Sequence, residues 1–372
     1  MDRLLLDART VQRRRGGIGR MVEGLVRALL RVAPGLEIHL VAGRKGVPGL
    51  GDGGARVREV RVDAGTVDLR FEAELLPTLV RELRPEAYHA TCFALPEERL
   101  ACRTVVTLHD ACVRRFPELV RPGLRELLDR ATVAALRTAD AVAAPSEFAR
   151  AELATAYAVP PLRIEVIPNG VEEDFFAPPG DAEVEDSRTR LGISERYWLV
   201  VGAEEERKGL PEAIAGYALH ARRIAGAPWP LLIAGGRGGG ARLNAQACAE
   251  SAGGFGLVRS LGYVSEGDLR VLYHGAAGVL CLSRYEGFGM PALEALAAGA
   301  PTIVADGSSL AEVVGTAALI VPPRDPEAVA EALDRVRSDP GMVTRLRTAG
   351  PARARRFTWE EAARRYLRLY GA

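Results

Sequence analysis

Short apolar runs alternate with amphipathic stretches along the chain, and this alternation limits its possible folds more than any other feature. Residues 3–6, 104–108, 198–201 and 278–282 are short, mainly apolar runs, and each leads into a loop and then a longer stretch. In residues 18–32 the apolar side chains recur at helical spacing. Strands buried on both faces read as continuous apolar runs, and parallel strands are joined by helices. The pattern therefore predicts an α/β protein built on parallel sheets.

The alternation stops once and then restarts. Residues 176–190 carry two prolines and a run of mixed charge instead of an apolar pattern. A chain of 372 residues is also long enough for two domains of about 100–200 residues each. We therefore expect two Rossmann-like domains with a cleft between them. The first domain takes residues 1–175, the linker residues 176–189 and the second domain residues 190–355.

Composition argues against several classes of protein. The 49 basic and 48 acidic residues give a net charge of +1, without the basic excess that nucleic-acid binding usually needs. No apolar run approaches the ~20 residues that cross a bilayer, and the first seven residues do not resemble a secretory signal. The five cysteines are odd in number and scattered, which suits a reducing compartment. We expect a cytoplasmic protein that binds no nucleic acid.

In open parallel sheets, ligands bind beyond the carboxyl ends of the strands, so the residues that follow each strand are the candidates. Gly16–Gly19 opens a helix, where free N–H groups suit an anion. It fits a dinucleotide motif poorly, because Val22 stands in place of the third glycine. His109 and Asp110 follow the strand at 104–108. A histidine there can bond a sugar hydroxyl or polarise a leaving group, and a buried structural histidine is the alternative.

The same segment leaves zinc open as an alternative. His89 and Cys92, and again His109 and Cys112, are spaced like zinc ligands, and Cys102 lies between the pairs. Free cysteines, however, are commonly small core residues. We therefore expect no metal site.

Two cations follow the strand at 198–201. Arg207 and Lys208 lie in the loop from Gly202 to Gly209, and Lys208 is one of only two lysines in a chain rich in arginine. An arginine fork beside a lysine charge suits a diphosphate. Glu204–Glu206 directly precede them, so a solvated charged loop is the alternative.

Two carboxylates follow the strand at 278–282. Glu286 lies in the loop, and Glu294 lies one turn into a helix whose first turn holds Pro291. Exposed N–H groups at such a helix start can receive an anion, and an acidic side chain can bind ribose hydroxyls. A solvated loop with a carboxylate near a helix start is the alternative.

Together these segments resemble the retaining family-4 glycosyltransferases of the GT-B fold. Glu286 and Glu294 have that family's Glu-x7-Glu spacing, and the sequence from Glu286 to Ala295 matches its motif almost letter for letter. Other segments similar to the family follow in the same order: Gly16–Arg20, Thr107–Asp110, Pro145–Phe148, Ile167–Val171, Gly202–Gly209, Gly262–Val264, Gly299–Pro301, Ala311–Gly315 and Phe357–Glu360. The resemblance implies an acceptor domain at 1–175, a donor domain at 190–355, and a C-terminal helix at 356–372 that returns to the first domain.

The resemblance also implies an activity: transfer of a hexosyl group from a nucleoside-diphosphate sugar, GDP- or UDP-hexose, to a hydroxyl of a glycan, lipid-linked or small-molecule acceptor, with no required cofactor. The implied catalytic residues are His109, Glu286, Arg207 and Lys208. The implied donor-binding residues are Gly17, Gly202, Arg207, Lys208, Gly236, Tyr263, Val264, Glu286, Gly287, Phe288, Gly289, Met290 and Glu294. The expected acceptor-binding residues are Arg13, Arg14, Arg15 and Asp110.

The arginine cluster at 13–15 suits an anionic acceptor, with a solvated loop as the equal alternative. A lipid-linked acceptor would bring the protein to the inner face of a membrane. The chain has no Asp-x-Asp triplet to hold a divalent ion, and no evident nucleophile, so we expect front-face transfer with retention and without a metal. Two further alternatives are an enzyme of the same architecture, such as a 2-epimerase or a glycogen-type phosphorylase, and an inactive scaffold that binds a sugar nucleotide.

Overall fold

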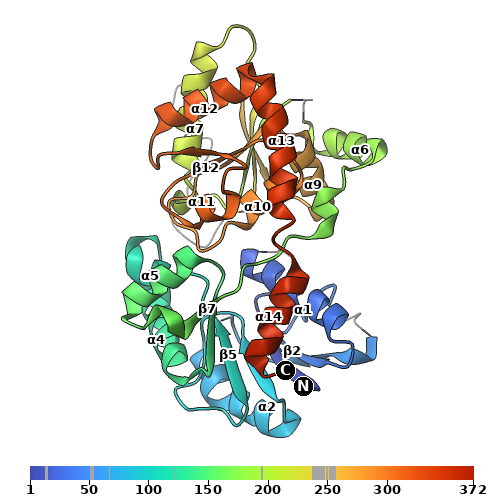
Figure 1. The fold of residues 1–372 in the computed structure, drawn as a ribbon, viewed down its shortest axis with the longest axis vertical. Helices are drawn as coiled ribbons and strands as arrows, with labels where there is room; N and C mark the ends of the chain where they lie inside the picture. Colours follow the sequence, from blue (N-terminus) through green and yellow to red (C-terminus); the bar gives the residue numbers. More distant parts are fainter. Residues whose placement is uncertain are drawn as a thin grey trace. The chain divides into compact units, whose positions relative to one another are not determined.

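The chain forms two compact α/β units in the computed structural model (Figure 1). Residues 1–170 with 357–372 make unit 1, and residues 171–356 make unit 2. The structure describes residues 1–12, 16–50, 54–66, 68–120, 122–193, 196–236, 248, 250 and 257–372. None of the helices in these ranges is long and apolar enough to cross a membrane.

Unit 1 is built on a parallel sheet of seven strands in the order β3-β2-β1-β4-β5-β6-β7. The strands are β1 (Arg3–Asp7), β2 (Glu37–Ala42), β3 (Val57–Arg61), β4 (Ala87–Ala90), β5 (Arg103–Thr107), β6 (Ala141–Ala144) and β7 (Ile164–Val166). Its helices include α1 (Gly17–Val32), α2 (Leu76–Leu83), α3 (Cys112–Arg115), α4 (Pro122–Thr138) and α5 (Glu147–Tyr157). The apolar run of β1 is fully buried, as strands covered on both faces require. Ser146 caps α5, accepting a hydrogen bond from the backbone N–H of Ala149 at 2.9 Å.

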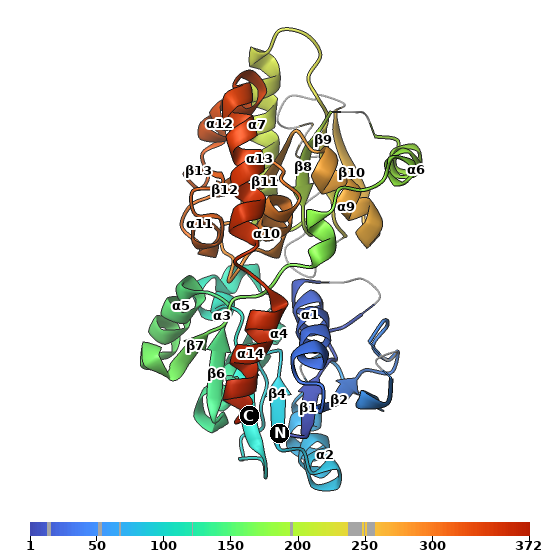
Figure 2. The same cartoon turned by 45° about the vertical axis from the view of Figure 1, so that its right-hand side comes forward.

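The last helix, α14 (Trp359–Tyr370), belongs to unit 1 and runs beside α1 (Figure 2). Its Trp359 ring lies so close to α1 that a Cβ at Gly24 would come within 2.2 Å of it. At its other end the Tyr370 hydroxyl bonds His89 Nδ1 at 2.7 Å, and the Tyr366 hydroxyl bonds Thr107 at 2.8 Å. The expectation that the C-terminal helix returns to the first domain is confirmed.

Unit 2 is built on a parallel sheet of six strands in the order β10-β9-β8-β11-β12-β13. The strands are β8 (Trp198–Val201), β9 (Leu231–Ala234), β10 (Val258–Gly262), β11 (Gly278–Cys281), β12 (Thr302–Ala305) and β13 (Leu319–Val321). Its helices include α7 (Leu210–Arg223), α9 (Glu266–Gly275), α10 (Met290–Ala297), α11 (Ser309–Val314), α12 (Pro326–Ser338) and α13 (Pro340–Ala354). Trp198, Tyr217 and Leu280 are buried in its main core.

Two features differ from the sequence expectation. The segment taken as a linker contains α6 (Asp181–Leu191), and its residues belong to unit 2. That helix begins with acidic and ends with basic side chains, and Gly192 ends it in a left-handed conformation. Charge order and a glycine cap support a helix without a clear apolar face, which explains why composition suggested a linker. The sequence also did not reveal β4, which is only four residues long and contains a tyrosine and a histidine. The helix expected at 240–252 lies largely outside the described residues.

Candidate active site

The two motif loops of unit 2 meet because their strands are neighbours. β11 pairs with β8 in parallel, with Leu280 opposite Val200, so both chains leave the sheet at the same edge. The backbone N–H of Arg284 donates to the carbonyl oxygen of Arg207 at 2.9 Å. Gly209 has a φ of +67°, and a Cβ there would lie 1.9 Å from the carbonyl oxygen of Leu282, the residue that follows β11. Only glycine satisfies both conditions, so the contact between the loops depends on it.

One carboxylate at this edge is shared by two cations. The Lys208 ammonium bonds Glu286 directly, and the Arg207 guanidinium lies 3.4 Å from the other carboxylate oxygen. The Ser283 hydroxyl donates to Glu286 at 2.8 Å. Burial acts to raise the pKa of Glu286, but the charges of Lys208 and Arg207 with these hydrogen bonds outweigh it and lower the pKa to about 2. Glu286 is therefore an anion at neutral pH, and its side chain is 14% exposed.

The second carboxylate of the motif is fixed by a tyrosine from another helix. Glu294 on α10 is 2% exposed, and the buried Tyr273 hydroxyl on α9 donates to its Oε2 at 2.9 Å. Nothing in the sequence singled out Tyr273, because it lies on the apolar face of an ordinary amphipathic helix. Gly289 precedes α10 with a φ of +100°, and a Cβ there would lie 2.4 Å from the Leu310 side chain.

The rest of the motif loop, residues 287–289, leads directly into α10. The chain there is largely buried at Phe288 and Met290, and the carbonyl of Glu286 accepts a 2.7 Å hydrogen bond from the Ser309 hydroxyl. Gly287 lies between Glu286 and Phe288 in this loop. The tertiary structure thus brings the predicted residues from Glu286 to Glu294 together with Arg207 and Lys208.

The ends of three strands bring together four more of the predicted donor-binding residues, Gly202, Gly236, Tyr263 and Val264. The N–H of Gly202, after β8, bonds the last residue of β9 at 3.0 Å, and the N–H of Glu204 bonds the carbonyl of Gly236 at 3.2 Å. The N–H of Gly235 bonds the carbonyl of Gly262 at 2.8 Å, which brings in the end of β10. Tyr263 and Val264 follow directly, and the Tyr263 side chain is 43% exposed.

Each carboxylate of the acidic run 204–206 lies beside a hydroxyl or guanidinium group. Glu204 accepts a hydrogen bond from Ser260, and Glu205 lies 3.9 Å from Arg207. Glu206 accepts a 2.6 Å bond from Arg284. The three carboxylates therefore have partners other than Lys208.

His109 lies in unit 1, at the carboxyl end of β5. Its Nε2 donates to the carbonyl oxygen of Thr91 at 2.7 Å, and because a carbonyl can only accept, Nε2 carries the proton. Burial lowers the pKa of His109, so the ring is neutral at pH 7 and Nδ1 is an acceptor. Thr91 is itself held by a 2.7 Å bond from its hydroxyl to the carbonyl of Asp7. Asp110 accepts from the N–H of Cys112 at 2.8 Å at the start of α3.

The two histidines considered as zinc ligands, His89 and His109, form hydrogen bonds within unit 1. His89 is fully buried, with Nε2 bonded to Thr107 at 2.8 Å and Nδ1 to Tyr370. Burial lowers its pKa to about 3, so this histidine is a neutral member of the bond network that holds α14. Within the described ranges, no three His, Cys, Asp or Glu side chains are grouped to hold a metal ion.

Gly17, the other predicted residue of unit 1 that the structure describes, is the first residue of α1. Among the described residues, a Cβ at Gly16 or Gly17 would meet nothing within 4 Å, so packing against them does not require glycine at either position. Gly19 differs, because a Cβ there would lie 3.1 Å from the carbonyl oxygen of Thr10. Arg13, Arg14 and Arg15 lie outside the described residues.

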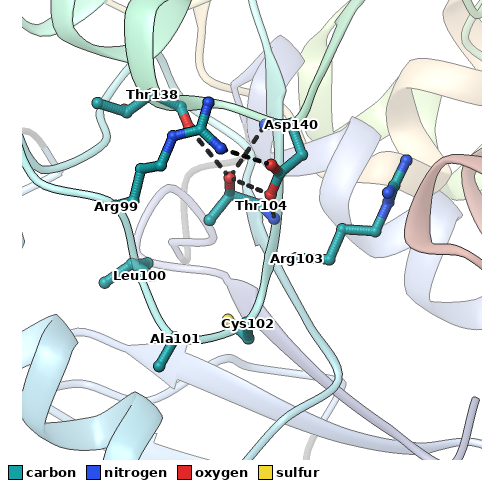
Figure 3. A pocket seen from close by; sticks show the side chains of 8 residues that line it. All are labelled: Arg99, Leu100, Ala101, Cys102, Arg103, Thr104, Thr138 and Asp140. Carbon is teal, nitrogen blue, oxygen red and sulfur yellow. Dashed lines mark hydrogen bonds and ion pairs between the residues drawn. The ribbon is translucent and has the colours of Figure 1, made fainter.

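A pocket of about 360 Å³ lies at the opposite end of β5 from His109 (Figure 3). It is lined by Arg99, Leu100, Ala101, Cys102, Arg103, Thr104, Thr138 and Asp140. Asp140 accepts from the backbone and the hydroxyl of Thr104 at 2.8 and 3.0 Å, and Arg99 lies 3.4 Å from it. The pocket holds none of the predicted site residues.

Two family models match the chain. Residues 15–175 match the model described as Glycosyltransferase Family 4, and residues 183–353 match the model described as Glycosyl transferases group 1. Together the matches cover most of unit 1 and most of unit 2.

Among proteins of similar sequence is the O-antigen chain mannosyltransferase B of Escherichia coli, which is 29% identical over 292 residues, 78% of this chain and 75% of that protein. The D-inositol 3-phosphate glycosyltransferase of Corynebacterium urealyticum is 29% identical over 69% of this chain and 60% of its own length. Mannosylfructose-phosphate synthase of Agrobacterium fabrum is 30% identical over 63% of this chain and 53% of its own length. The matches thus span between half and three quarters of these relatives.

Solved structures share the fold over the full chain. Sucrose-phosphate synthase from Thermosynechococcus elongatus superposes with a TM-score of 0.79 at 21% identity, covering 100% of this chain and 98% of that one. Anabaena HepE in complex with UDP and glucose superposes with a TM-score of 0.73 at 16% identity, covering 99% of each chain. At these identities the likeness is one of fold.

Proposed function

The chain belongs to the family-4 glycosyltransferases, and from that premise we propose that it transfers a hexosyl group from a nucleoside-diphosphate sugar to a hydroxyl acceptor. Its two Rossmann-like units confirm the expected GT-B fold. The observation that carries the proposal is the sharing of the Glu286 carboxylate between Lys208 and Arg207 at the carboxyl edge of β8 and β11.

We place the donor diphosphate on Arg207 and Lys208. In the structure these cations hold Glu286, and an incoming diphosphate would compete with that carboxylate for the same N–H groups. Released in part from Lys208, Glu286 would accept hydrogen bonds from hydroxyls of the transferred sugar. We assign Glu294, which accepts a hydrogen bond from Tyr273, to the hydroxyls of the ribose.

The chemical step follows from where charge develops. The bond between the sugar carbon and the diphosphate oxygen breaks, a bond from that carbon to the acceptor oxygen forms, and the acceptor proton passes to the departing diphosphate. Preorganised cations stabilise the charge on the leaving oxygens. Glu286 and Glu294 are both held by hydrogen bonds, so neither is a ready nucleophile. We therefore propose attack on the face from which the diphosphate leaves, which retains configuration.

His109 fits a contact with the donor sugar better than a role as a general acid. Its only ring proton is used by Thr91, and its ring is neutral at pH 7. Nδ1 would therefore accept a hydrogen bond from a sugar hydroxyl. The predicted support of diphosphate departure would then come through orientation of the sugar instead of through proton transfer.

The relatives guide the choice of donor and acceptor. The names of two of them, a mannosyltransferase and a mannosylfructose-phosphate synthase, indicate mannosyl transfer, and one solved neighbour is in complex with UDP and glucose. A GDP- or UDP-hexose donor and a glycan, lipid-linked or small-molecule acceptor therefore remain the proposed substrates.

The test begins with calorimetric binding of UDP, GDP, ADP and TDP, each with and without magnesium. Tight binding of one nucleoside diphosphate, followed by transfer from the matching sugar nucleotide, supports the proposal, and the magnesium arm decides whether a metal is needed. Binding without transfer or donor hydrolysis would instead indicate an inactive sugar-nucleotide scaffold. No binding to any of the four would refute both.

A further inference from the structure

Arg284 binds two acidic side chains, Glu206 in the donor loop and Glu212 at the start of α7. It lies between the two loops of the proposed donor site and was not among the predicted site residues. Its guanidinium donates to Glu206 at 2.6 Å and to Glu212 at 2.9 and 3.2 Å. Its backbone N–H also bonds the carbonyl of Arg207 at 2.9 Å. One arginine thus joins the strand end of β11 to the loop after β8 and to the first turn of α7.

The two carboxylates that Arg284 binds differ in exposure, because the Glu206 side chain is 42% exposed and also meets water whereas Glu212 is buried. The Glu212 side chain is 11% exposed, and its buried Oε2 has no hydrogen-bond partner among the described residues. Glu206 directly precedes Arg207 in the chain. The hydrogen bonds and charges of both acids outweigh burial and raise the pKa of Arg284, so its charge is permanent.

We propose that Arg284 is a positioning residue of the donor site, which neutralises Glu206 and Glu212 and so keeps Arg207 and Lys208 available to the donor diphosphate. This rests on the proposed function. Arg207 and Lys208 already face Glu286, and Arg207 also faces Glu205.

The physical argument concerns both charge and geometry. Without Arg284, the negative charges of Glu206 and Glu212 would no longer be balanced beside the loop that must receive a diphosphate anion, and the charge of the buried Glu212 would be poorly screened by water. The acid next to Arg207 would also be free to bind that cation in place of the ligand. The arginine fork supplies a bond to each acid at once, which a lysine cannot do with the same geometry.

The experiment measures the dissociation constant of the nucleoside diphosphate that the unmodified protein binds, by calorimetry on the full chain at low and high salt. Arg284→Gln should raise Kd about tenfold at low salt, the scale of one uncompensated charge near the ligand, and by less at high salt. The Kd of Arg284→Lys should lie between the Kd of the unmodified protein and that of Arg284→Gln. A triple variant that adds Glu206→Gln and Glu212→Gln should bind within about threefold of the unmodified protein, because the acids that need Arg284 are gone.

Arg223→Gln is the matched control. Arg223 also bridges two carboxylates, Asp334 and Glu327, but at the far end of α7 from the donor loop. It should leave Kd unchanged. Glu206→Gln alone keeps Arg284 and should tighten binding, which tests the proposal even where Arg284→Gln does not fold.

The outcomes separate two failures. If the unmodified protein binds none of the nucleoside diphosphates, the proposed function fails. If it binds one and Arg284→Gln binds it equally well, or if the triple variant does not recover binding while its melting temperature recovers, the role of Arg284 is refuted.

Discussion

Replacing Glu286 by glutamine should strengthen binding of the free nucleoside diphosphate while slowing sugar transfer. Glu286 is an anion whose pKa is lowered from 4.5 to about 2. A difference of this size corresponds to roughly 3 kcal/mol of interaction that favours the ionised carboxylate. Most of the attraction comes from Lys208 and Arg207, the same cations that we assign to the diphosphate. A bound diphosphate must therefore compete with Glu286 for them.

Glu286→Gln removes that competitor but keeps the shape of the side chain. If the ligand recovers about half of the interaction, Kd for the diphosphate falls about tenfold. The turnover of the sugar nucleotide should fall, because the amide accepts hydrogen bonds from sugar hydroxyls less strongly than a carboxylate does. Calorimetry with the diphosphate and initial rates with the sugar nucleotide measure the two effects.

Glu294→Gln is the control with the opposite sign. Its proposed partner is the ribose, so the diphosphate should bind more weakly to that variant. The reasoning about Glu286 is wrong if Glu286→Gln, with an unchanged fold by circular dichroism, binds the diphosphate more weakly than the unmodified protein.

The pKa of Glu286 in the folded protein also sets a pH window for its contribution to stability. Because it is lowered, the stability that Glu286 contributes is complete above pH 4.5 and is lost as the pH falls towards 2, so the melting temperature of Glu286→Gln should change less than that of the unmodified protein across this window.

Three further predictions follow from the site geometry. Tyr273→Phe removes the hydrogen bond to Glu294 and should raise Kd for the diphosphate about tenfold, the scale of a hydrogen bond to a charged group. Tyr197→Phe is its control, because it loses a buried hydrogen bond to the backbone carbonyl of Leu272 on the same helix and should lower stability without changing Kd. His109→Gln should lower kcat, and the pH profile of the unmodified protein should show no step near pH 6.5, since burial lowers the pKa of His109; a step there that the variant abolishes would contradict the neutral-acceptor role. Gly209→Ala should abolish diphosphate binding, because its methyl group would lie 1.9 Å from a carbonyl oxygen and separate the two loops; binding within threefold of the unmodified protein would show that the loops do not need this contact.

Much of the fold and the composition of the candidate site could be predicted from the sequence. Parallel strands buried on both faces leave a recognisable pattern, and glycines, prolines and charged residues collect at their carboxyl ends. The return of the C-terminal helix to the first domain is confirmed. Where the pattern was weak, the prediction missed structure: β4 is too short to stand out, and α6 is stabilised by charge order and a glycine cap rather than by an apolar face.

The sequence by itself determined the architecture and the residue types at each strand end, because these depend on local periodicity and on backbone requirements of single residues. Only the tertiary structure decided which side chains are partners. Arg284 binds Glu212 and Glu206, which are 72 and 78 residues away in the chain, because β8 and β11 are neighbours in the sheet. The local sequence pattern does not predict the order of the strands. His89 likewise became part of the contact with α14 through a tyrosine 281 residues further along the chain. Side-chain chemistry is local, whereas the partner that sets its charge, proton and orientation is chosen by packing.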